Sequence, residues 1–309
     1  MLSRVLGAQR SEIIVRFNDR LEQRNPLRRH RERTSQRFVH ASRRLGVVVL
    51  VGRFHFGLNY MASQAHQAKN QGRCIFCNSL GLTKEHLWAD WLRVYLPRTM
   101  LRHTTQSTLV DPHMEDQVSI ERRPGDFYSR RIRCVCATCN NGWMSRLQTS
   151  ARPFLIPFLT GQPTTVHKRG RRILSAWIAM MVIVGEYATR EFIAVPASDR
   201  DYLHREQVPP SHWRIWIGAH ACEQFPLYSH NVLSLAKEKA EGAPDDFLPE
   251  PNTQTTTICV GDYLVIYVMS SIIARSQIRR WVLPVQIRGG MHQIWPIGLK
   301  APMFLGRRF

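Results

Sequence analysis

Acidic residues are scarce in this chain of 309 residues. Asp and Glu number 23 against 43 Lys and Arg, which leaves a formal net charge of +20. An excess of positive charge this large is typical of proteins that bind the phosphate backbone of nucleic acids. The composition therefore agrees with a nucleic acid as the partner.

Long hydrophobic runs are also lacking. The apolar stretches 45–51 and 173–184 are shorter than the roughly 20 residues that a helix needs to cross a bilayer. The chain shows no secretory signal, no internal repeat and neither of the glycine-rich phosphate loops, GxGxxG and Walker A. These absences exclude a membrane partner and a nucleotide-binding loop, and we expect a cytoplasmic protein.

Lysine is missing from the first 60 residues, although this segment holds thirteen arginines and four acidic residues. Its apolar residues show weak periodicity, which favours disorder. The arginine excess fits a mitochondrial transit peptide only in part. We expect residues 1–60 to be disordered, or to be an over-extended start that precedes a true start at Met61.

Cysteines are few, but four of the seven form two Cys-x-x-Cys pairs, Cys74 with Cys77 and Cys136 with Cys139. Two such turns supply the four thiolates of a tetrahedral zinc site. Disulfides are the alternative, but an odd number of cysteines in a reducing compartment favours the metal. Such a shell has no open position, so the zinc is expected to be structural.

The other three cysteines have less specific surroundings. Cys134 lies close enough in sequence to replace Cys136 as a ligand, although the two-residue spacing favours Cys136. Cys222 and Cys259 lie in apolar stretches, where a small buried hydrophobic residue is the usual role of cysteine.

The cysteine pairs enclose a Glu85-His86 pair, and Asn140 follows the second pair directly. This order resembles the zinc-stapled branch of the HNH endonuclease family. The resemblance covers about residues 70–150 and implies a ββα-metal fold, in which His86 ends the first strand and Asn140 opens the helix. It further implies that His86 is the general base and that Glu85 and Asn140 hold a catalytic Mg²⁺ or Mn²⁺ ion.

The chain departs from the family pattern at three points, the first being Leu87-Trp88-Ala89, where many relatives have an apolar pair and then proline. The 58 residues from 78 to 135 exceed the 15 to 20 of compact zinc modules, so we expect an insertion of roughly forty residues that loops out from the site. The third metal position of the family, a His or Asn, falls near Gln148, which is a poor ligand. The ion would then be held by Glu85, Asn140, phosphate oxygens and water.

The resemblance therefore implies a metal-dependent endonuclease that hydrolyses phosphodiester bonds in nucleic acid, with DNA favoured, and in which His86 activates water. A zinc-organised nucleic-acid-binding module without catalysis is the alternative. Four basic residues near the site are candidates for backbone contacts, namely Arg130, Arg131, Arg133 and Arg146. A solvated charged strand edge is the competing interpretation for each of them.

Three parts of the chain follow from these patterns: the segment 1–60, an HNH-like zinc module at 61–150 with its insertion, and an α+β domain of unknown role at 151–309. In the last part, residues 173–184 predict a buried helix and residues 199–206 a short helix. Alternating or β-branched stretches predict strands at 213–217, 255–259, 263–269, 281–286 and near Ile294, with a hairpin turn at Gly261-Asp262.

Overall fold

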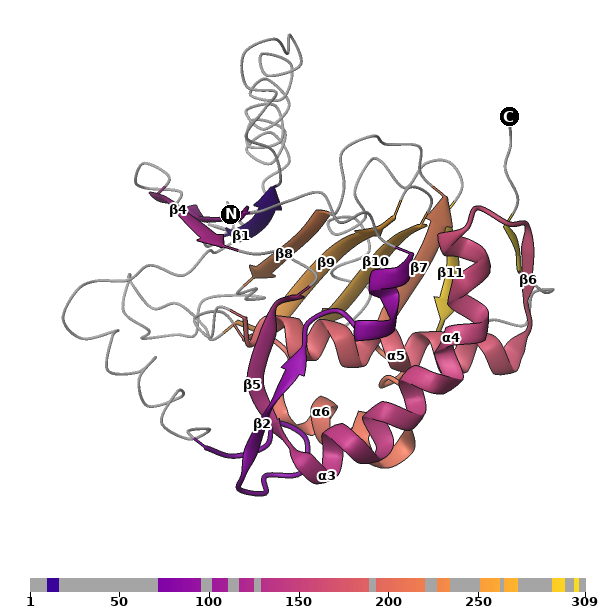
Figure 1. The fold of residues 1–309 in the computed structure, drawn as a ribbon, viewed down its shortest axis with the longest axis horizontal. Helices are drawn as coiled ribbons and strands as arrows, with labels where there is room; N and C mark the ends of the chain where they lie inside the picture. Colours follow the sequence, from indigo (N-terminus) through magenta and orange to yellow (C-terminus); the bar gives the residue numbers. More distant parts are fainter. Residues whose placement is uncertain are drawn as a thin grey trace, which may run out of the picture.

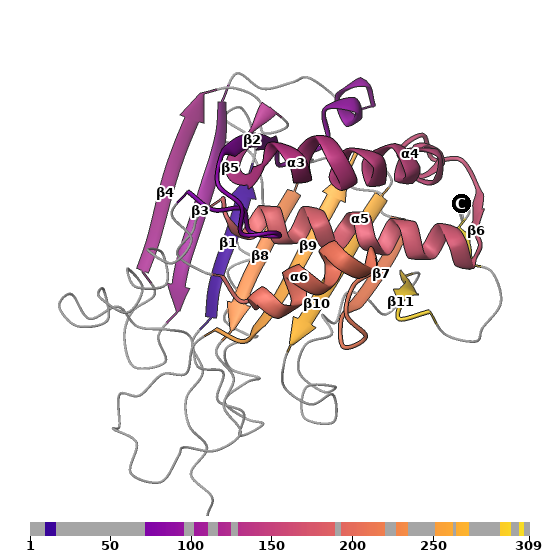
Figure 2. The same cartoon turned by 90° about the horizontal axis from the view of Figure 1, so that it is seen from below.

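The computed structural model describes residues 10–16, 72–95, 102–110, 117–124, 129–188, 193–219, 227–233, 251–261, 264–271, 291–297 and 303–305. The fold is of the α+β class, as predicted. Its largest element is an antiparallel sheet in the order β11-β7-β10-β9-β8-β1-β3-β4 (Figures 1 and 2). The strands are β1 (Arg10–Arg16), β3 (Arg102–Val110), β4 (Gln117–Pro124), β7 (Arg214–Ala219), β8 (Leu227–Leu233), β9 (Thr253–Val260), β10 (Leu264–Ser271) and β11 (Met291–Trp295).

Helices cover one face of this sheet. In Figure 2, α5 (Lys168–Glu186) crosses the strands β8 to β7, with α4 (Ser145–Leu159) on one side and α6 (Ala197–Glu206) on the other. Residues 174–187 are all buried, which confirms the predicted buried helix. Among the described residues, no helix has the length and apolar character needed to cross a membrane.

Two glycines set how closely α5 approaches its neighbours. A Cβ atom at Gly170 would lie 2.9 Å from the Phe154 ring of α4, and one at Gly185 would overlap the hydroxyl of Tyr228 on β8. Because glycine has no side chain, α5 packs directly against both α4 and the sheet. The Gly170 contact packs the second half of α4 against the first turn of α5.

The predicted strands of the C-terminal part are found where the structure describes them. β9 and β10 pair as the expected hairpin, and β7, β11 and α6 match the stretches at 213–217, near Ile294 and at 199–206. Alternation of apolar and polar residues specifies β7 locally, whereas β9 and β10 are buried over most of their length. Residues 281–286 lie outside the described part. A small second sheet pairs β6 (Thr164–Val166) with β12 (Met303–Leu305).

The cysteine module is built from an antiparallel strand pair followed by a helix. β2 (Leu82–His86) pairs with β5 (Arg131–Cys136), and the chain continues through the short α3 (Ala137–Cys139) and the π-helical turn η3 (Asn140–Met144) into α4. His86 ends β2, as expected. The helical segment begins at Ala137 with Cys136 as its N-cap, so Asn140 lies inside this segment, whereas the sequence had led us to expect that it opens the helix.

The chain between the two cysteine pairs does more than loop out. After a 3₁₀ helix at Asp90–Val94, it forms β3 and β4, which pair with each other at the end of the large sheet. β3 also pairs with β1. The insertion therefore adds two strands to the sheet. Residues 96–101, 111–116 and 125–128 lie outside the described ranges.

Within residues 1–60, the structure describes Arg10–Arg16 alone, as β1 between β8 and β3. Three consecutive β-branched residues, Ile13, Ile14 and Val15, favour a strand here. A paired strand at these seven positions differs from the disorder expected of them. The rest of the segment lies outside the described residues.

One continuous core joins the cysteine module to the sheet and helices. Buried apolar residues from Cys74 to Met144 and from Leu147 to Ile294 belong to the same cluster. The boundary expected at residue 150 falls inside α4, which packs against α5. The position of the cysteine module is therefore fixed by the C-terminal part of the chain.

Candidate functional site

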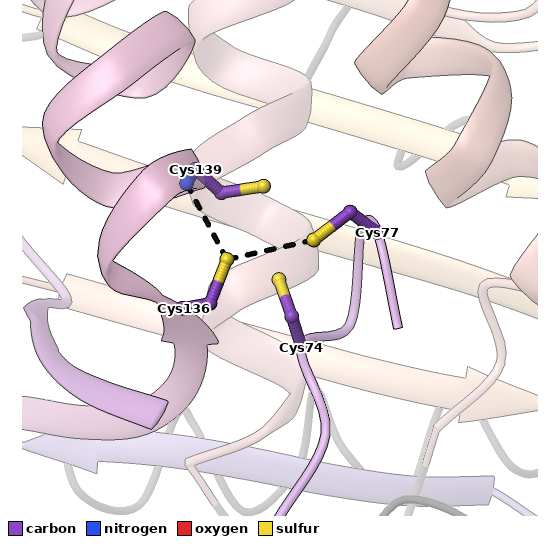
Figure 3. A group of neighbouring side chains, drawn as sticks. All are labelled: Cys74, Cys77, Cys136 and Cys139. Atoms are coloured by element: carbon purple, nitrogen blue, oxygen red, sulfur yellow. Dashed lines mark hydrogen bonds between the residues drawn. The ribbon is translucent and has the colours of Figure 1, made fainter. Parts of the chain in front are cut away.

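The four cysteines of the two pairs converge on one point. The sulfurs of Cys74, Cys77, Cys136 and Cys139 all lie within 4.8 Å of one another, and 3.5 Å separates those of Cys77 and Cys136 (Figure 3). Tetrahedral bonds of about 2.3 Å to a single zinc ion require sulfur separations of this size. The four side chains are therefore placed to bind one metal ion such as zinc, as the sequence predicts.

The local backbone geometry of each Cys-x-x-Cys turn directs its two sulfurs toward a common centre. In the first turn, Asn78 adopts a left-handed conformation with φ of 59° and its N–H donates to the Cys74 carbonyl at 2.9 Å. In the second, the Cys139 N–H lies 3.4 Å from the Cys136 sulfur, which caps the start of α3. Both contacts are those of a Cys-x-x-Cys turn that points two sulfurs at a common centre.

Burial raises the pKa of Cys74 and of Cys139. Burial also acts on Cys77, but hydrogen bonds from Ser79 and the neighbouring sulfurs outweigh it and lower the pKa of Cys77 to about 6. Cys77 is therefore the thiol that most readily supplies a thiolate at neutral pH. A bound cation would deprotonate the others, since metal ligation requires the thiolate form.

Cys134 is buried but lies outside the cluster. The register of β5 explains why: Val135 pairs with Thr83 and Arg133 with Lys84, so Cys134 is the additional residue of a β-bulge. A bulge interrupts the alternation that would otherwise place residues two apart on the same face. The six described cysteines form no disulfide, Cys259 is buried as expected, and Cys222 lies outside the described residues.

Two residues of the helical layer hold the first cysteine turn in place. Arg200 of α6 donates to the Ile75 carbonyl at 3.1 Å and to the Val195 carbonyl at 2.6 Å. Trp143 of η3 packs edge-on against Phe76, with ring centroids 5.0 Å apart. Neither residue stands out in the sequence, because both contacts depend on the tertiary packing of the module.

A polar cluster lies beside the cysteines, between β2 and the start of α4. Glu85 accepts a hydrogen bond from Gln148 at 3.1 Å and another from the Asn140 side chain. Asn140 also donates to the Thr83 hydroxyl at 3.1 Å, and that hydroxyl donates to the Val135 carbonyl at 3.0 Å. The amide nitrogens of Asn140 and Gln148 are thus used as donors, which leaves their amide oxygens as acceptors or ligands.

Glu85 is a buried carboxyl, 5% exposed. Burial raises its pKa to about 7, although the N–H donors of Gln148 and Asn140 favour the ionised form. Within the part of the chain that the structure describes, no cationic side chain forms an ion pair with it. A buried carboxylate that is hydrogen-bonded but has no cationic partner fits a site for a cation.

His86 lies at the end of β2, next to this cluster. Its Nδ1 atom is buried without a hydrogen bond to any described residue and lies 3.9 Å from Asp90 Oδ1, whereas 19% of the side chain is exposed. Burial and the charge of Arg131 lower the pKa of His86. The imidazole is therefore neutral at physiological pH and able to accept a proton.

The structure separates the two predicted catalytic roles in space. Adjacent strand residues leave opposite faces of a strand, so Glu85 is directed toward α4, and His86 has Asp90 as its charged neighbour. Glu85, Asn140 and Gln148 form one group. The hydrogen bonds of that group do not include His86.

The four predicted backbone-binding arginines have different surroundings. Arg131, Arg133 and Arg146 are exposed. Arg130 is half-buried, and its guanidinium donates to the Ala188 carbonyl at 2.8 Å, which ties β5 to the end of α5. This contact gives Arg130 a structural role that the charge pattern alone does not predict.

Comparisons of the chain with models of protein families, with curated proteins and with solved structures gave no match. A functional proposal therefore depends on the residues and geometry described above. Thr83 and Arg200 are site residues that the sequence pattern did not indicate. Of these two residues, only Thr83 could have been found from the sequence, because strand alternation places it on the same face of β2 as Glu85.

Proposed function

We propose that this protein is a metal-dependent endonuclease of the HNH type, which hydrolyses phosphodiester bonds in nucleic acid, with DNA the favoured substrate. One observation carries the proposal: the module that holds the four-cysteine cluster also joins Glu85 to Asn140 by a hydrogen bond, and His86 follows Glu85 at the end of β2. A buried carboxylate, an amide oxygen and a neutral imidazole are the groups that hydrolysis by a bound ion and a general base requires.

In this proposal the zinc is structural. Its four sulfur ligands would fill the tetrahedral shell, so no position would remain for water or substrate. The ion would fix the first cysteine turn against η3 and thereby hold β2 beside the start of α4. The distance between Glu85 and Asn140 is set by this arrangement.

The catalytic cation would be held by Glu85 and Asn140. Oxygen ligands of this kind suit Mg²⁺ or Mn²⁺, which when bound supply positive charge to the phosphate and to the departing oxygen. Gln148 would orient the carboxylate through its 3.1 Å hydrogen bond to Glu85 Oε1. Thr83 would orient the Asn140 amide in the same way.

His86 would act as the general base. The neutral imidazole takes a proton from a water molecule as its oxygen attacks phosphorus. The bond from phosphorus to the 3′ oxygen then breaks, and that oxygen acquires a proton from solvent. General-base catalysis of this kind typically contributes about 10² to 10⁴ in rate.

A second candidate, a zinc-organised nucleic-acid-binding module, is favoured by a specific observation. Glu85 is buried and engaged by two amides, an arrangement that also serves as a polar contact inside a purely structural module. What favours the enzyme is that Glu85 has no cationic partner among the residues that the structure describes. A binder needs neither a cation site nor a base next to it.

The test is cleavage of supercoiled plasmid by the purified full chain with Mg²⁺, with Mn²⁺ and with EDTA. We expect cleavage that needs a divalent ion and that falls by at least about 100-fold in His86→Ala. His292→Ala, at an exposed position on β11, serves as the matched control and should cleave normally. Plasmid that is bound but left intact under all three conditions would support the binding module instead.

A further inference from the structure

A cleft of about 600 Å³ lies on the helical layer, between α4, the first turns of α5 and the end of α6. Four cationic side chains line it: Arg146 from α4, and Lys168, Arg169 and Arg172 from α5. Trp143 and Ile173 are among its apolar residues. Neither Glu85, His86 nor Asn140 lines this cleft.

Within the described part of the chain, none of the four cations that line the cleft has a carboxylate within ion-pair distance. α4 contains no acidic residue, and the single acidic residue of α5, Glu186, lies at the opposite end of that helix. Like charges gathered in this way repel one another, so an anionic ligand would relieve the repulsion.

The start of α5 adds to the field of the cleft. His167, at its N-cap, makes no side-chain capping hydrogen bond, and the first turn contains no acidic residue. The N-terminus of a 19-residue helix carries a partial positive charge and unpaired N–H groups. These groups lie next to Lys168 and Arg169, which line the cleft, and therefore act in the same direction as the side-chain charges.

α4 separates the cleft from the polar cluster around Glu85. One face of the helix lines the cleft. Its residues are three or four positions apart, namely Trp143, Arg146, Leu147 and Ser150. Gln148 lies about 200° around the helix from Arg146 and contacts Glu85. The two sites are thus one helix diameter apart, roughly 10 to 12 Å, which spans about two phosphates of an extended strand.

We propose that this cleft is a second contact site for the phosphate backbone of the nucleic acid, separate from the place of cleavage. The inference rests on the proposed function in taking nucleic acid as the ligand. Guanidinium and ammonium groups bind successive phosphates, and the helix start adds N–H donors for the same oxygens. Lys168, Arg169 and Arg172 are thereby assigned to substrate binding.

The chemistry of the cleft points to backbone contacts without base recognition. Trp143 is 7% exposed, so its ring is not available to stack on a base. The cleft contributes many charges but few polar groups with the fixed geometry that base edges require. Binding here should therefore depend on salt and on chain length, and should show little dependence on sequence.

Salt dependence tests the proposal. Affinity of the full zinc-bound chain for a fluorescent duplex is measured without Mg²⁺ between low and moderate salt. The variants are Lys168→Gln, Arg169→Gln, Arg172→Gln and their triple combination. We expect the slope of log K against log salt to become shallower by about 0.9 for each residue that contacts a phosphate.

Arg205→Gln is the matched control, because Arg205 is an exposed helical arginine whose charge is already paired with Asp201 at 3.2 Å. Its slope should equal that of the wild type. Zinc content and thermal midpoint confirm that each variant is folded. A triple variant with the wild-type slope would overturn the proposal, as would equal affinity of the wild type for a free mononucleotide and for the duplex.

The binding measurement and the cleavage measurement test the two proposals independently. If the triple variant changes the slope but the wild type cleaves no plasmid, the cleft assignment holds and the nuclease proposal fails. If plasmid is cleaved but the slopes are equal, the nuclease holds and the cleft assignment fails. Where both hold, the triple variant should raise KM for cleavage and leave kcat near the wild-type value.

Discussion

Gln148 Nε2 donates a hydrogen bond to Glu85 Oε1 at 3.1 Å, across 63 positions of the sequence. Gln148 therefore holds the carboxyl of Glu85 from α4. The hydrogen bond fixes one carboxylate oxygen and favours the ionised form. In the proposed enzyme, Gln148 thus acts on the ion through Glu85.

Replacing Gln148 tests this positioning role. Gln148→Ala removes the donor, so the Glu85 carboxyl loses its orientation and its pKa rises further. We expect the Mg²⁺ or Mn²⁺ concentration for half-maximal cleavage to increase by roughly 10- to 100-fold, with less effect at saturating ion. Thr149→Ala, the neighbouring exposed position on α4, is the control. An unchanged ion dependence would contradict the role of Gln148.

Zinc content distinguishes ligands from neighbouring cysteines. Cys136→Ser should lose the ion and lower the thermal midpoint, because Cys136 belongs to the cluster and also caps α3. Cys134→Ser, two residues away and equally buried at 3%, should retain one zinc per chain. Metal analysis and thermal denaturation give both results. Loss of zinc in Cys134→Ser would show that the bulge does not exclude this residue.

The pH dependence of cleavage reports on His86. As a general base it must be neutral, so kcat/KM should rise with pH and reach a plateau, with an apparent pKa below the usual 6.5. Arg131 lowers the pKa of His86. Arg131→Gln should therefore move the rising limb to higher pH, which a pH-rate profile at saturating Mg²⁺ would detect. A limb that stays in place would mean that another group titrates.

Stability without divalent ions should reveal the cost of burying Glu85. In the unfolded chain its carboxyl ionises near 4.5, but in the folded chain it does so near 7. Between these values the folded state binds more protons, so its stability falls as pH rises. Glu85→Gln has no such loss and should be more stable than the wild type at pH 8, by at most about 3 kcal/mol, with the difference vanishing toward pH 4.5.

Denaturant unfolding at several pH values measures this difference, with EDTA-free buffers so that zinc is retained. Adding Mg²⁺ should stabilise the wild type, because a cation near the carboxylate offsets its burial, and should leave Glu85→Gln unchanged. A wild type that is as stable as the variant at pH 8 would show that the carboxyl is solvated in the folded protein.

Local patterns were sufficient to predict the elements whose own residues decide their structure. Residues 173–184 form a helix because nearly all of them are apolar, and the β9–β10 hairpin follows from two β-branched runs around Gly261. Each of the two cysteine turns was predictable for the same reason, since each forms within four residues. In these cases the sequence neighbours are also the structural neighbours.

Long-range pairing was not predictable in this way. β3 is rich in threonine and serine and lacks a clear apolar face, so its place in the sheet depends on strands far away in sequence. The bulge at Cys134 leaves no mark in the sequence, because it arises from the register with β2. The Thr83–Asn140 contact likewise exists only after the two cysteine turns have met.

The path of the chain between the two cysteine pairs gives the metal a further effect. From residue 78 to residue 135 the chain leaves the cysteine cluster, adds β3 and β4 to the far end of the sheet, and returns. An ion bound to both pairs closes this segment into a ring, as a disulfide would. A covalent link around a ring of about 60 residues removes roughly 4 kcal/mol of entropy from the unfolded chain. Chelation should therefore loosen the distant β3–β4 edge as well as the cysteine turns, and hydrogen exchange at that edge should accelerate when the metal is withdrawn.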